Sequence, residues 1–127
     1  ITHWSGTWHK DHQNCYGIAR DAIFFAELPG ISRSLPPHKV DKLFYAENWE
    51  DALGFETDTY LDISSVYRRW IEACDVYPMW RGQTGFFQYD SYYQSLAVMR
   101  GCLSGFRYAV ALMRDPHQRL EKVGSLL

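Results

Sequence analysis

The sequence lacks several features that would place it in a particular class of protein. It has only three cysteines, an odd number with no Cys-x-x-Cys pair, which argues against a disulfide scaffold and a thiolate zinc site. No stretch approaches the roughly 18 uninterrupted apolar residues that a membrane span requires. The formal net charge of −2 gives no electrostatic footprint for nucleic acid or for an anionic membrane. These absences favour a protein that binds neither nucleic acid nor a bilayer.

The three cysteines each lie on or beside the apolar stripe of an expected helix, at Cys15, Cys74 and Cys102. Apolar surroundings of this kind predict buried free thiols in a reducing cytoplasm. A catalytic cysteine is the weaker alternative, because nothing in the sequence marks one of the three as an activated thiolate. We therefore expect a cytoplasmic protein.

Aromatic residues are abundant, at 17% of the 127 residues, and hydrophobic residues make up 46%. A chain of this length forms one domain at most, and a small domain buries a smaller share of its surface than a large one. We infer that part of the apolar surface meets something outside the chain, either a missing portion of the domain or a neighbour in a homo-oligomer.

One short stretch, Thr7–His12, concentrates chemically useful side chains. It places two imidazoles and a carboxylate, at His9, Asp11 and His12, within four positions just before a helical pattern. If Asp11 caps that helix, the three side chains crowd at its N-terminal end. One imidazole could then bind a metal, while the other, held by the carboxylate, donates to a developing oxyanion. The alternative is a polar helix start with two solvated histidines.

Hydrophobic periodicity predicts helices and strands in the order helix, strand, strand, helix, helix, over residues 11–28, 40–46, 55–63, 64–77 and 90–114. Ser64 or Ser65 is expected to cap the fourth of these elements. Gly101 and Gly105, four apart in the last helix, are expected to admit another backbone at close range. The loop that carries Trp80 and Arg81 suits either sugar recognition or packing, and packing is favoured.

Several stretches together resemble the LmbE/PIG-L family of zinc-dependent de-N-acetylases. The family carries a His-x-Asp-His motif at the start of a helix, and residues 9–12 match it with lysine where proline is usual. Further similarity runs through the expected first helix, a short strand, a strand with the following helix start, and the expected last helix, at Ala19–Phe24, Leu43–Tyr45, Tyr60–Ser64 and Tyr92–Ala109.

The resemblance implies that residues 1–127 are a single partial domain, the C-terminal half of a deacetylase domain. The implied fold is the later part of a Rossmann-like three-layer α/β architecture with short strands and long helices. The family's N-terminal half carries a His-Pro-Asp-Asp motif that supplies a base and two zinc ligands, and this motif is absent from the sequence. The implied partner is therefore that N-terminal half, as part of the same enzyme or as a second chain.

The resemblance also implies a reaction, the zinc-dependent hydrolysis of an N-acetyl group on a small molecule that contains N-acetylglucosamine. In it, His12 is the third Zn²⁺ ligand, His9 stabilises the oxyanion or protonates the departing amine, and Asp11 orients the His9 ring. Substrate-binding residues stay unassigned. Lys10 and Val110 depart from the family pattern, the second because glutamate often stands there. The alternative function is a non-catalytic sugar-binding or interaction subunit that retains the family fold.

Overall fold

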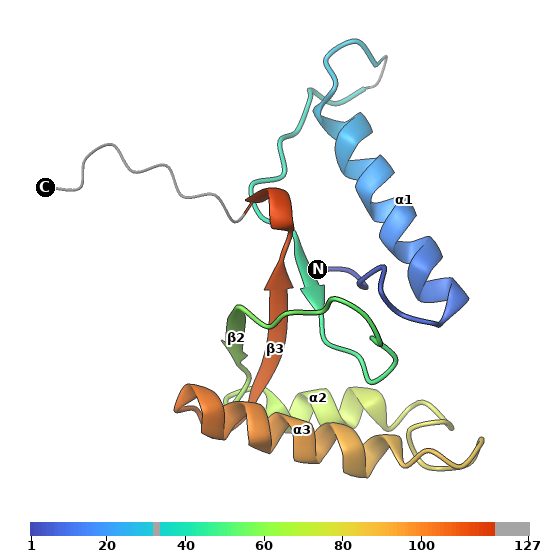
Figure 1. Ribbon diagram of the computed structural model, residues 1–127, viewed down its shortest axis with the longest axis vertical. Helices are drawn as coiled ribbons and strands as arrows, with labels where there is room; N and C mark the ends of the chain where they lie inside the picture. Colours follow the sequence, from blue (N-terminus) through green and yellow to red (C-terminus); the bar gives the residue numbers. More distant parts are fainter. Residues whose placement is uncertain (32–33, 119–127) are drawn as a thin grey trace, which may run out of the picture. The chain divides into compact units, whose positions relative to one another are not determined.

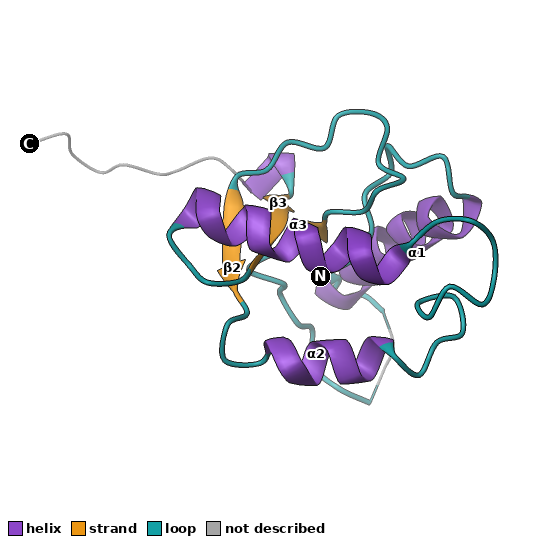
Figure 2. Ribbon diagram, turned by 90° about the horizontal axis from the view of Figure 1, so that it is seen from below, coloured by secondary structure: helices purple, strands orange, loops and turns teal. Residues whose placement is uncertain are grey.

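The structure is a computed structural model that describes residues 1–31 and 34–118. Over these residues the chain is a mixed α/β protein with three α-helices and a small three-stranded sheet, joined by long loops (Figure 2). Its internal contacts divide it into two compact units. The first comprises Ile1–Thr59 and the chain from Leu112 onward, and the second comprises Tyr60–Ala111. The expected α/β class is confirmed.

Helix α1 (Lys10–Glu27) begins and ends within one residue of the predicted helix. The expectation that Asp11 caps it is wrong, because His9 is the N-cap residue and its Nδ1 accepts a hydrogen bond from the Asp11 backbone N–H at 3.2 Å. Asp11 instead lies in the first turn, where a carboxylate interacts favourably with the positive end of the helix dipole. Pro29, directly after the C-cap residue Leu28, prevents the helix from continuing.

The core of the first unit forms around two antiparallel strands, β1 (Phe44–Ala46) and β3 (Ala109–Arg114), which Figure 1 shows side by side. Tyr45 pairs with Met113, and both side chains are fully buried. The neighbouring apolar side chains that pack with this pair are Leu43, Trp4, Tyr16, Ile23 and Phe55. Strand β1 is shorter than the predicted strand over 40–46, because only residues 44–46 of that range pair with β3.

The predicted helix over 90–114 is wrong in its second half. Helix α3 (Tyr89–Ser104) ends at Gly105, which has a left-handed φ of 78°, and β3 follows after a short turn. Glycine adopts this conformation without the steric cost that a Cβ imposes, so it commonly ends helices. The apolar spacing that suggested one long helix continues past the turn because a buried strand is also a run of apolar residues.

Gly101 does admit a backbone at close range, as the sequence predicted. The approaching backbone belongs to the turn that follows α3, since a Cβ on Gly101 would lie 2.8 Å from the Phe106 carbonyl oxygen and 2.7 Å from that of Arg107. The Phe106 N–H also donates to the Gly101 carbonyl at 3.0 Å. Gly105 differs, because a Cβ there would have nothing within 4 Å.

Replacing Gly101 with alanine should therefore lower the free energy of unfolding by roughly 1–3 kcal/mol, because the backbone of the turn must move to admit a methyl group. The matched control is Gly17→Ala in the middle of α1, where a Cβ would meet nothing within 4 Å. That variant should gain roughly 0.5–1 kcal/mol from its better helix propensity. Urea denaturation followed by circular dichroism measures both changes. A Gly101→Ala chain as stable as the unmodified one would contradict the packing described here.

The second unit contains β2 (Thr59–Asp62) from its second residue on, followed by α2 (Tyr67–Cys74) and α3. Both β2 and α2 are shorter than the predicted elements over 55–63 and 64–77. The expected serine cap is wrong, because α2 starts after Val66 with no side-chain cap. Ser64 Oγ instead accepts a hydrogen bond from the Tyr108 N–H at 3.1 Å and thereby ties β2 to the start of β3.

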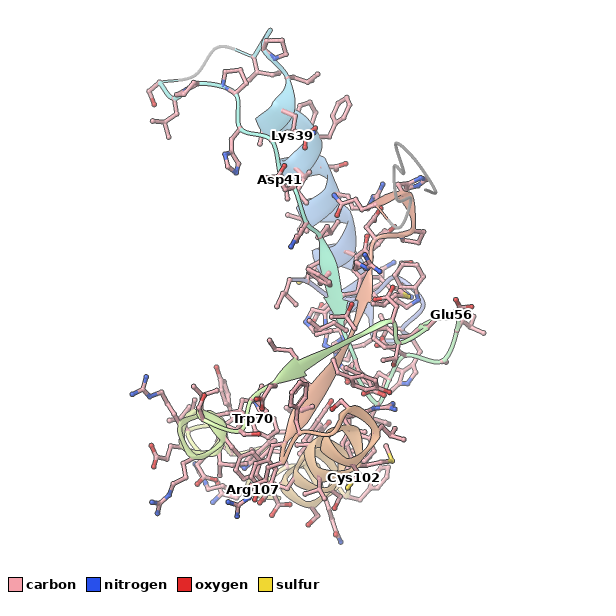
Figure 3. All side chains as sticks on the ribbon, turned by 90° about the vertical axis from the view of Figure 1, so that its left-hand side faces the viewer. Lys39, Asp41, Glu56, Trp70, Cys102 and Arg107 are labelled. Carbon is pink, nitrogen blue, oxygen red and sulfur yellow. The ribbon has the colours of Figure 1, made fainter. Side chains whose placement is uncertain are left out.

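Aromatic rings fill the interior of the second unit. Tyr67 stacks on Tyr108 with ring centroids 3.7 Å apart, and Trp80, which is only 7% exposed, contacts the rings of Trp70 and Tyr93. Trp70 points from α2 toward the other aromatic side chains of this unit (Figure 3). The packing interpretation of the Trp80 loop is confirmed.

The expectation of buried cysteines is wrong. All three thiols are free, but Cys15 and Cys102 are exposed and Cys74 is half-buried. Cys15 is exposed because α1 has no fully buried residue, so its apolar stripe is only partly covered. In the part of the chain that the structure describes, no helix combines the length and apolarity needed to cross a membrane.

Candidate functional site

The predicted motif at the start of α1 is brought against a loop about forty residues further along the chain. Thr2 forms a parallel bridge with Tyr45, and Thr7 forms an antiparallel bridge with Asp51. The Trp8 N–H donates to the Glu50 carbonyl at 3.3 Å. Residues 2–8 are therefore held along both β1 and the loop over 47–54, all within the first unit.

Gly6 allows this pairing because it has no side chain. A Cβ at this position would lie 1.8 Å from the Leu53 carbonyl oxygen and 2.5 Å from Trp4 Nε1. The same carbonyl accepts a hydrogen bond from Trp4 Nε1 at 2.8 Å, and the Leu53 N–H donates to the Gly6 carbonyl at 3.1 Å. Any larger residue at position 6 would push the loop away from the motif.

The pairing gathers three imidazoles into one stack, which we call the histidine stack (His3, His9 and His12). The His12 ring lies parallel to that of His3 with centroids 3.9 Å apart, and it lies against that of His9 with centroids 4.4 Å apart. Two rings cannot share one face of an imidazole at these distances without overlapping, so His3 and His9 cover opposite faces of His12.

A buried carboxylate meets the edge of the central ring. Glu50 has a side chain only 7% exposed, and its Oε2 lies 2.9 Å from His12 Nδ1. Asn48 Nδ2 lies 3.2 Å from the same nitrogen, where donor and acceptor roles depend on the tautomer of the imidazole. Glu50 Oε2 is buried and has no hydrogen bond of good geometry to any described residue, so its 2.9 Å ion-pair contact with His12 Nδ1 is the contact closest to satisfying it.

His9 is held differently from His12. Its Nδ1 accepts from the Asp11 backbone N–H, and its own backbone N–H donates to Thr7 Oγ1 at 3.2 Å. Asp11 therefore holds the His9 ring through its main chain, and no contact of its carboxylate with that ring is seen among the described residues. Because Nδ1 accepts a hydrogen bond, a neutral His9 carries its own proton on Nε2. Nε2 is then the nitrogen that can donate to a ligand.

Burial lowers the pKa of both His3 and His12 below the usual 6.5, and the neighbouring imidazoles lower it further. Nearby carboxylates act in the opposite direction, Glu50 on His3 and Asp11 on His12, but more weakly than burial. These shifts favour the neutral form of His3 and His12, the form in which imidazole binds a metal ion. In the same loop, burial raises the pKa of Asp51 to about 6.

These shifts have opposite effects on stability as the pH falls. For His3 and His12, with pKa values below 6.5 in the folded chain, the unfolded chain binds protons first, so stability is lost as the pH falls below 6.5. For Asp51, the folded chain binds its proton first, so stability is gained as the pH falls through about 6. Acidification from pH 6.5 to 5 should thus destabilise an Asp51→Asn chain more steeply than the unmodified chain. Urea denaturation at half-unit pH steps measures both slopes, and a shallower slope for the variant would contradict this assignment.

Of the residues that the sequence singled out, the structure brings His9 and His12 together and leaves Asp11 on the exposed side of the first turn. Sequence reasoning missed His3, Asn48 and Glu50, which reach His12 from other segments. It also missed that Trp8, beside His9, is 59% exposed and rests edge-on against Trp49. A pattern search for polar residues in the loop over 47–51 would have found Asn48 and Glu50 but not their target.

The described residues offer few side chains that could act together as metal ligands. Within residues 1–31 and 34–118, no three His, Cys, Asp or Glu side chains stand together as a set that could hold a metal ion. His12 has the chemistry of one ligand, since burial favours its neutral form and its Nδ1 lies 2.9 Å from a buried carboxylate. Metal-bound histidines usually have such a carboxylate, a backbone carbonyl or a water at the other ring nitrogen. Compared with models of known protein families, the chain matches none.

Proposed function

We propose that this chain supplies the His-x-Asp-His half of the active site of a metal-dependent de-N-acetylase. The substrate class is a small molecule with an N-acetylglucosamine unit, and the products are acetate and the free amine. The observation that carries the proposal is the contrast between the two motif histidines. His9 has an acceptor at Nδ1 and therefore a donor at Nε2, while His12 lies beside a buried carboxylate. One ring is thus suited to donate and the other to bind.

In this proposal His9 Nε2 donates a hydrogen bond to the carbonyl oxygen of the acetyl group as negative charge develops there. The same proton can pass to the departing amine when the C–N bond breaks. The His9 ring is suited to this because its position is fixed twice, by the Asp11 N–H at Nδ1 and by stacking on His12. The role assigned to Asp11 therefore becomes one of its backbone N–H.

His12 would hold Zn²⁺ as one of three protein ligands. When bound, zinc polarises the amide carbonyl and lowers the pKa of a bound water. The residues present fit such an ion as part of a set, and the remaining donors would come from a segment that carries His-Pro-Asp-Asp. From the resemblance of the sequence to the LmbE/PIG-L family, we also propose that the α/β fold is the later half of a Rossmann-like LmbE/PIG-L domain. The segment that carries His-Pro-Asp-Asp would be its partner.

The test is an assay of acetate release from an N-acetylglucosamine derivative, with zinc content measured on the same sample. The chain is assayed alone and together with a polypeptide that carries His-Pro-Asp-Asp. We expect acetate release only in the combined sample, with about one zinc per pair. A combined sample that releases no acetate and binds no zinc would reject the proposed enzyme.

The alternative is an interaction subunit without catalysis, and one observation favours it. Helix α1 exposes an apolar row with the spacing of a helix–helix contact, and the members are Cys15, Ile18, Ala22 and Phe25. Such a row suits contact with another copy of this chain or with another protein. Sedimentation of the purified chain separates the two readings when combined with the zinc assay, because a stable oligomer without metal or acetate release supports the subunit.

A further inference from the structure

The His12 ring has only one part of its surface left for a ligand. His3 and His9 cover its two faces, and Glu50 and Asn48 meet its Nδ1. The His12 side chain is still 20% exposed. Nε2 has no hydrogen-bond partner among the described residues and is not among their buried unpartnered atoms, so the uncovered part of the ring includes the Nε2 edge.

Whether Nε2 can bind anything depends on which nitrogen carries the proton. A neutral imidazole has one N–H and one lone pair, and only the lone pair binds a metal ion. Glu50, as a carboxylate, accepts hydrogen bonds and donates none. A lone pair on Nδ1 would face the lone pairs of Glu50 Oε2 at 2.9 Å, and a buried carboxylate oxygen would have no donor among its described neighbours.

We propose that Glu50 is a positioning residue that fixes His12 in the Nδ1–H tautomer and so presents the Nε2 lone pair at the uncovered edge of the ring. The proposal requires the Asn48 amide to be flipped, so that Oδ1 in place of Nδ2 lies 3.2 Å from His12 Nδ1 and accepts from the same N–H, an assignment that the hydrogen-bond network decides. The use of that lone pair for zinc rests on the proposed function, whereas the tautomer does not.

Glu50 is well placed to hold this geometry. Its side chain is buried, and its main chain is tied to the segment before the histidines because its carbonyl accepts from the Trp8 N–H. Thr7 and Asp51, the residues adjacent to Trp8 and Glu50, form the antiparallel bridge. The carboxylate thus reaches His12 from a backbone that is itself paired with the start of α1.

The experiment is ¹⁵N nuclear magnetic resonance of the histidine side chains in the metal-free chain at pH 7.5. The signals of His12 are identified as those that disappear in His12→Ala. We expect its Nδ1 to resonate as a protonated nitrogen and its Nε2 as an unprotonated one. In Glu50→Gln, whose amide can donate as well as accept, we expect the shifts to move toward the opposite tautomer.

The matched control is Asp51→Asn, which removes one carboxylate charge at the adjacent position. Asp51 Oδ2 accepts from the Asn48 N–H at 2.9 Å, a contact that asparagine can keep through its amide oxygen. The control should leave the His12 tautomer unchanged, and the backbone amide spectrum shows whether each variant is folded. An Nε2–H tautomer or a doubly protonated ring in the unmodified chain overturns the proposal, so the conclusion does not depend on Glu50→Gln folding.

Unchanged His12 shifts in a folded Glu50→Gln chain would also overturn it. The same variants test the proposed function separately, in the sample combined with a polypeptide that carries His-Pro-Asp-Asp. Zn²⁺ added to this combined sample should shift Nε2 of His12, and Glu50→Gln should weaken zinc binding about 10- to 100-fold. An Nδ1–H tautomer in the metal-free chain, with no response to zinc in the combined sample, supports the positioning role and counts against the de-N-acetylase.

Discussion

Replacing His9 with alanine should slow acetate release by roughly 100- to 1,000-fold while the metal content stays unchanged. In the proposed mechanism His9 contributes a hydrogen-bond donor at Nε2 and no ligand atom, since its Nδ1 already accepts from the Asp11 N–H. Loss of one such donor removes stabilisation of the oxyanion without removing any contact to the metal. The measurement is acetate release by the combined sample, with zinc quantified in parallel.

His12→Ala should differ from His9→Ala in its zinc content when both are measured in the same assay. Removal of a ligand should abolish zinc binding and acetate release together. The matched control is His38→Ala, a histidine in an exposed loop outside the histidine stack, which should change neither quantity. Full acetate release by His9→Ala would remove His9 from the mechanism, and zinc retained by His12→Ala would remove His12 from the ligands.

Replacing Asp115 with alanine should lower the free energy of unfolding by roughly 3 kcal/mol. Asp115 is 3% exposed, and its Oδ2 accepts from both the Tyr45 hydroxyl and the Arg20 guanidinium at 2.5 Å. Its loss leaves the Tyr45 hydroxyl without its acceptor in the core and the half-buried Arg20 guanidinium without its carboxylate partner. This is a large fraction of the roughly 5–15 kcal/mol that stabilises a typical domain.

The matched comparison for Asp115 is Tyr45→Phe, which removes one hydroxyl and leaves the ion pair with Arg20 in place. It should cost only about 1–2 kcal/mol, because the hydroxyl donates to Asp115 and accepts a longer hydrogen bond from Arg20 at 3.3 Å. Urea denaturation at pH 7 measures both variants. Equal losses for the two would show that the ion pair contributes nothing beyond the tyrosine contact.

The same carboxylate predicts how the chain responds to strong acid. Burial alone would raise the pKa of Asp115, but hydrogen bonds from Tyr45 and the His117 N–H, together with the Arg20 charge, hold it below its usual value. A lowered pKa contributes stability that is complete above about pH 4 and is lost as the pH falls through the value in the folded chain. The Asp115→Ala variant should therefore lose less stability than the unmodified chain on acidification below pH 4.

Local patterns predicted the elements whose boundaries depend on nearby residues. Helix α1 was predicted to within one residue because its apolar stripe ends at Pro29. The end of α3 was missed because the apolar spacing continues unchanged across Gly105 into β3. A period of three to four residues and a short buried strand cannot be distinguished in a run of five apolar residues. Only the pairing of β3 with β1 decides, and that pairing joins residues about seventy positions apart.

The candidate site divides in the same way. His9 and His12 lie within one turn of helix, so sequence spacing alone places them together. Asn48 is 36 positions from His12, and no local rule connects the two. Burial of Glu50 could not be anticipated either, because charged residues in a loop are exposed in most proteins. Its burial follows from the antiparallel bridge between Thr7 and Asp51.

The absence of a side chain at Gly6 has a consequence for finding relatives of this protein. The histidine spacing alone occurs by chance in many unrelated chains. A search that also demands glycine three positions before the first motif histidine, together with an Asn-x-Glu triplet some forty residues downstream, is far more selective. Chains that satisfy all three conditions should share the backbone pairing, whereas chains with a bulkier residue at that position should lack it even where both histidines are present.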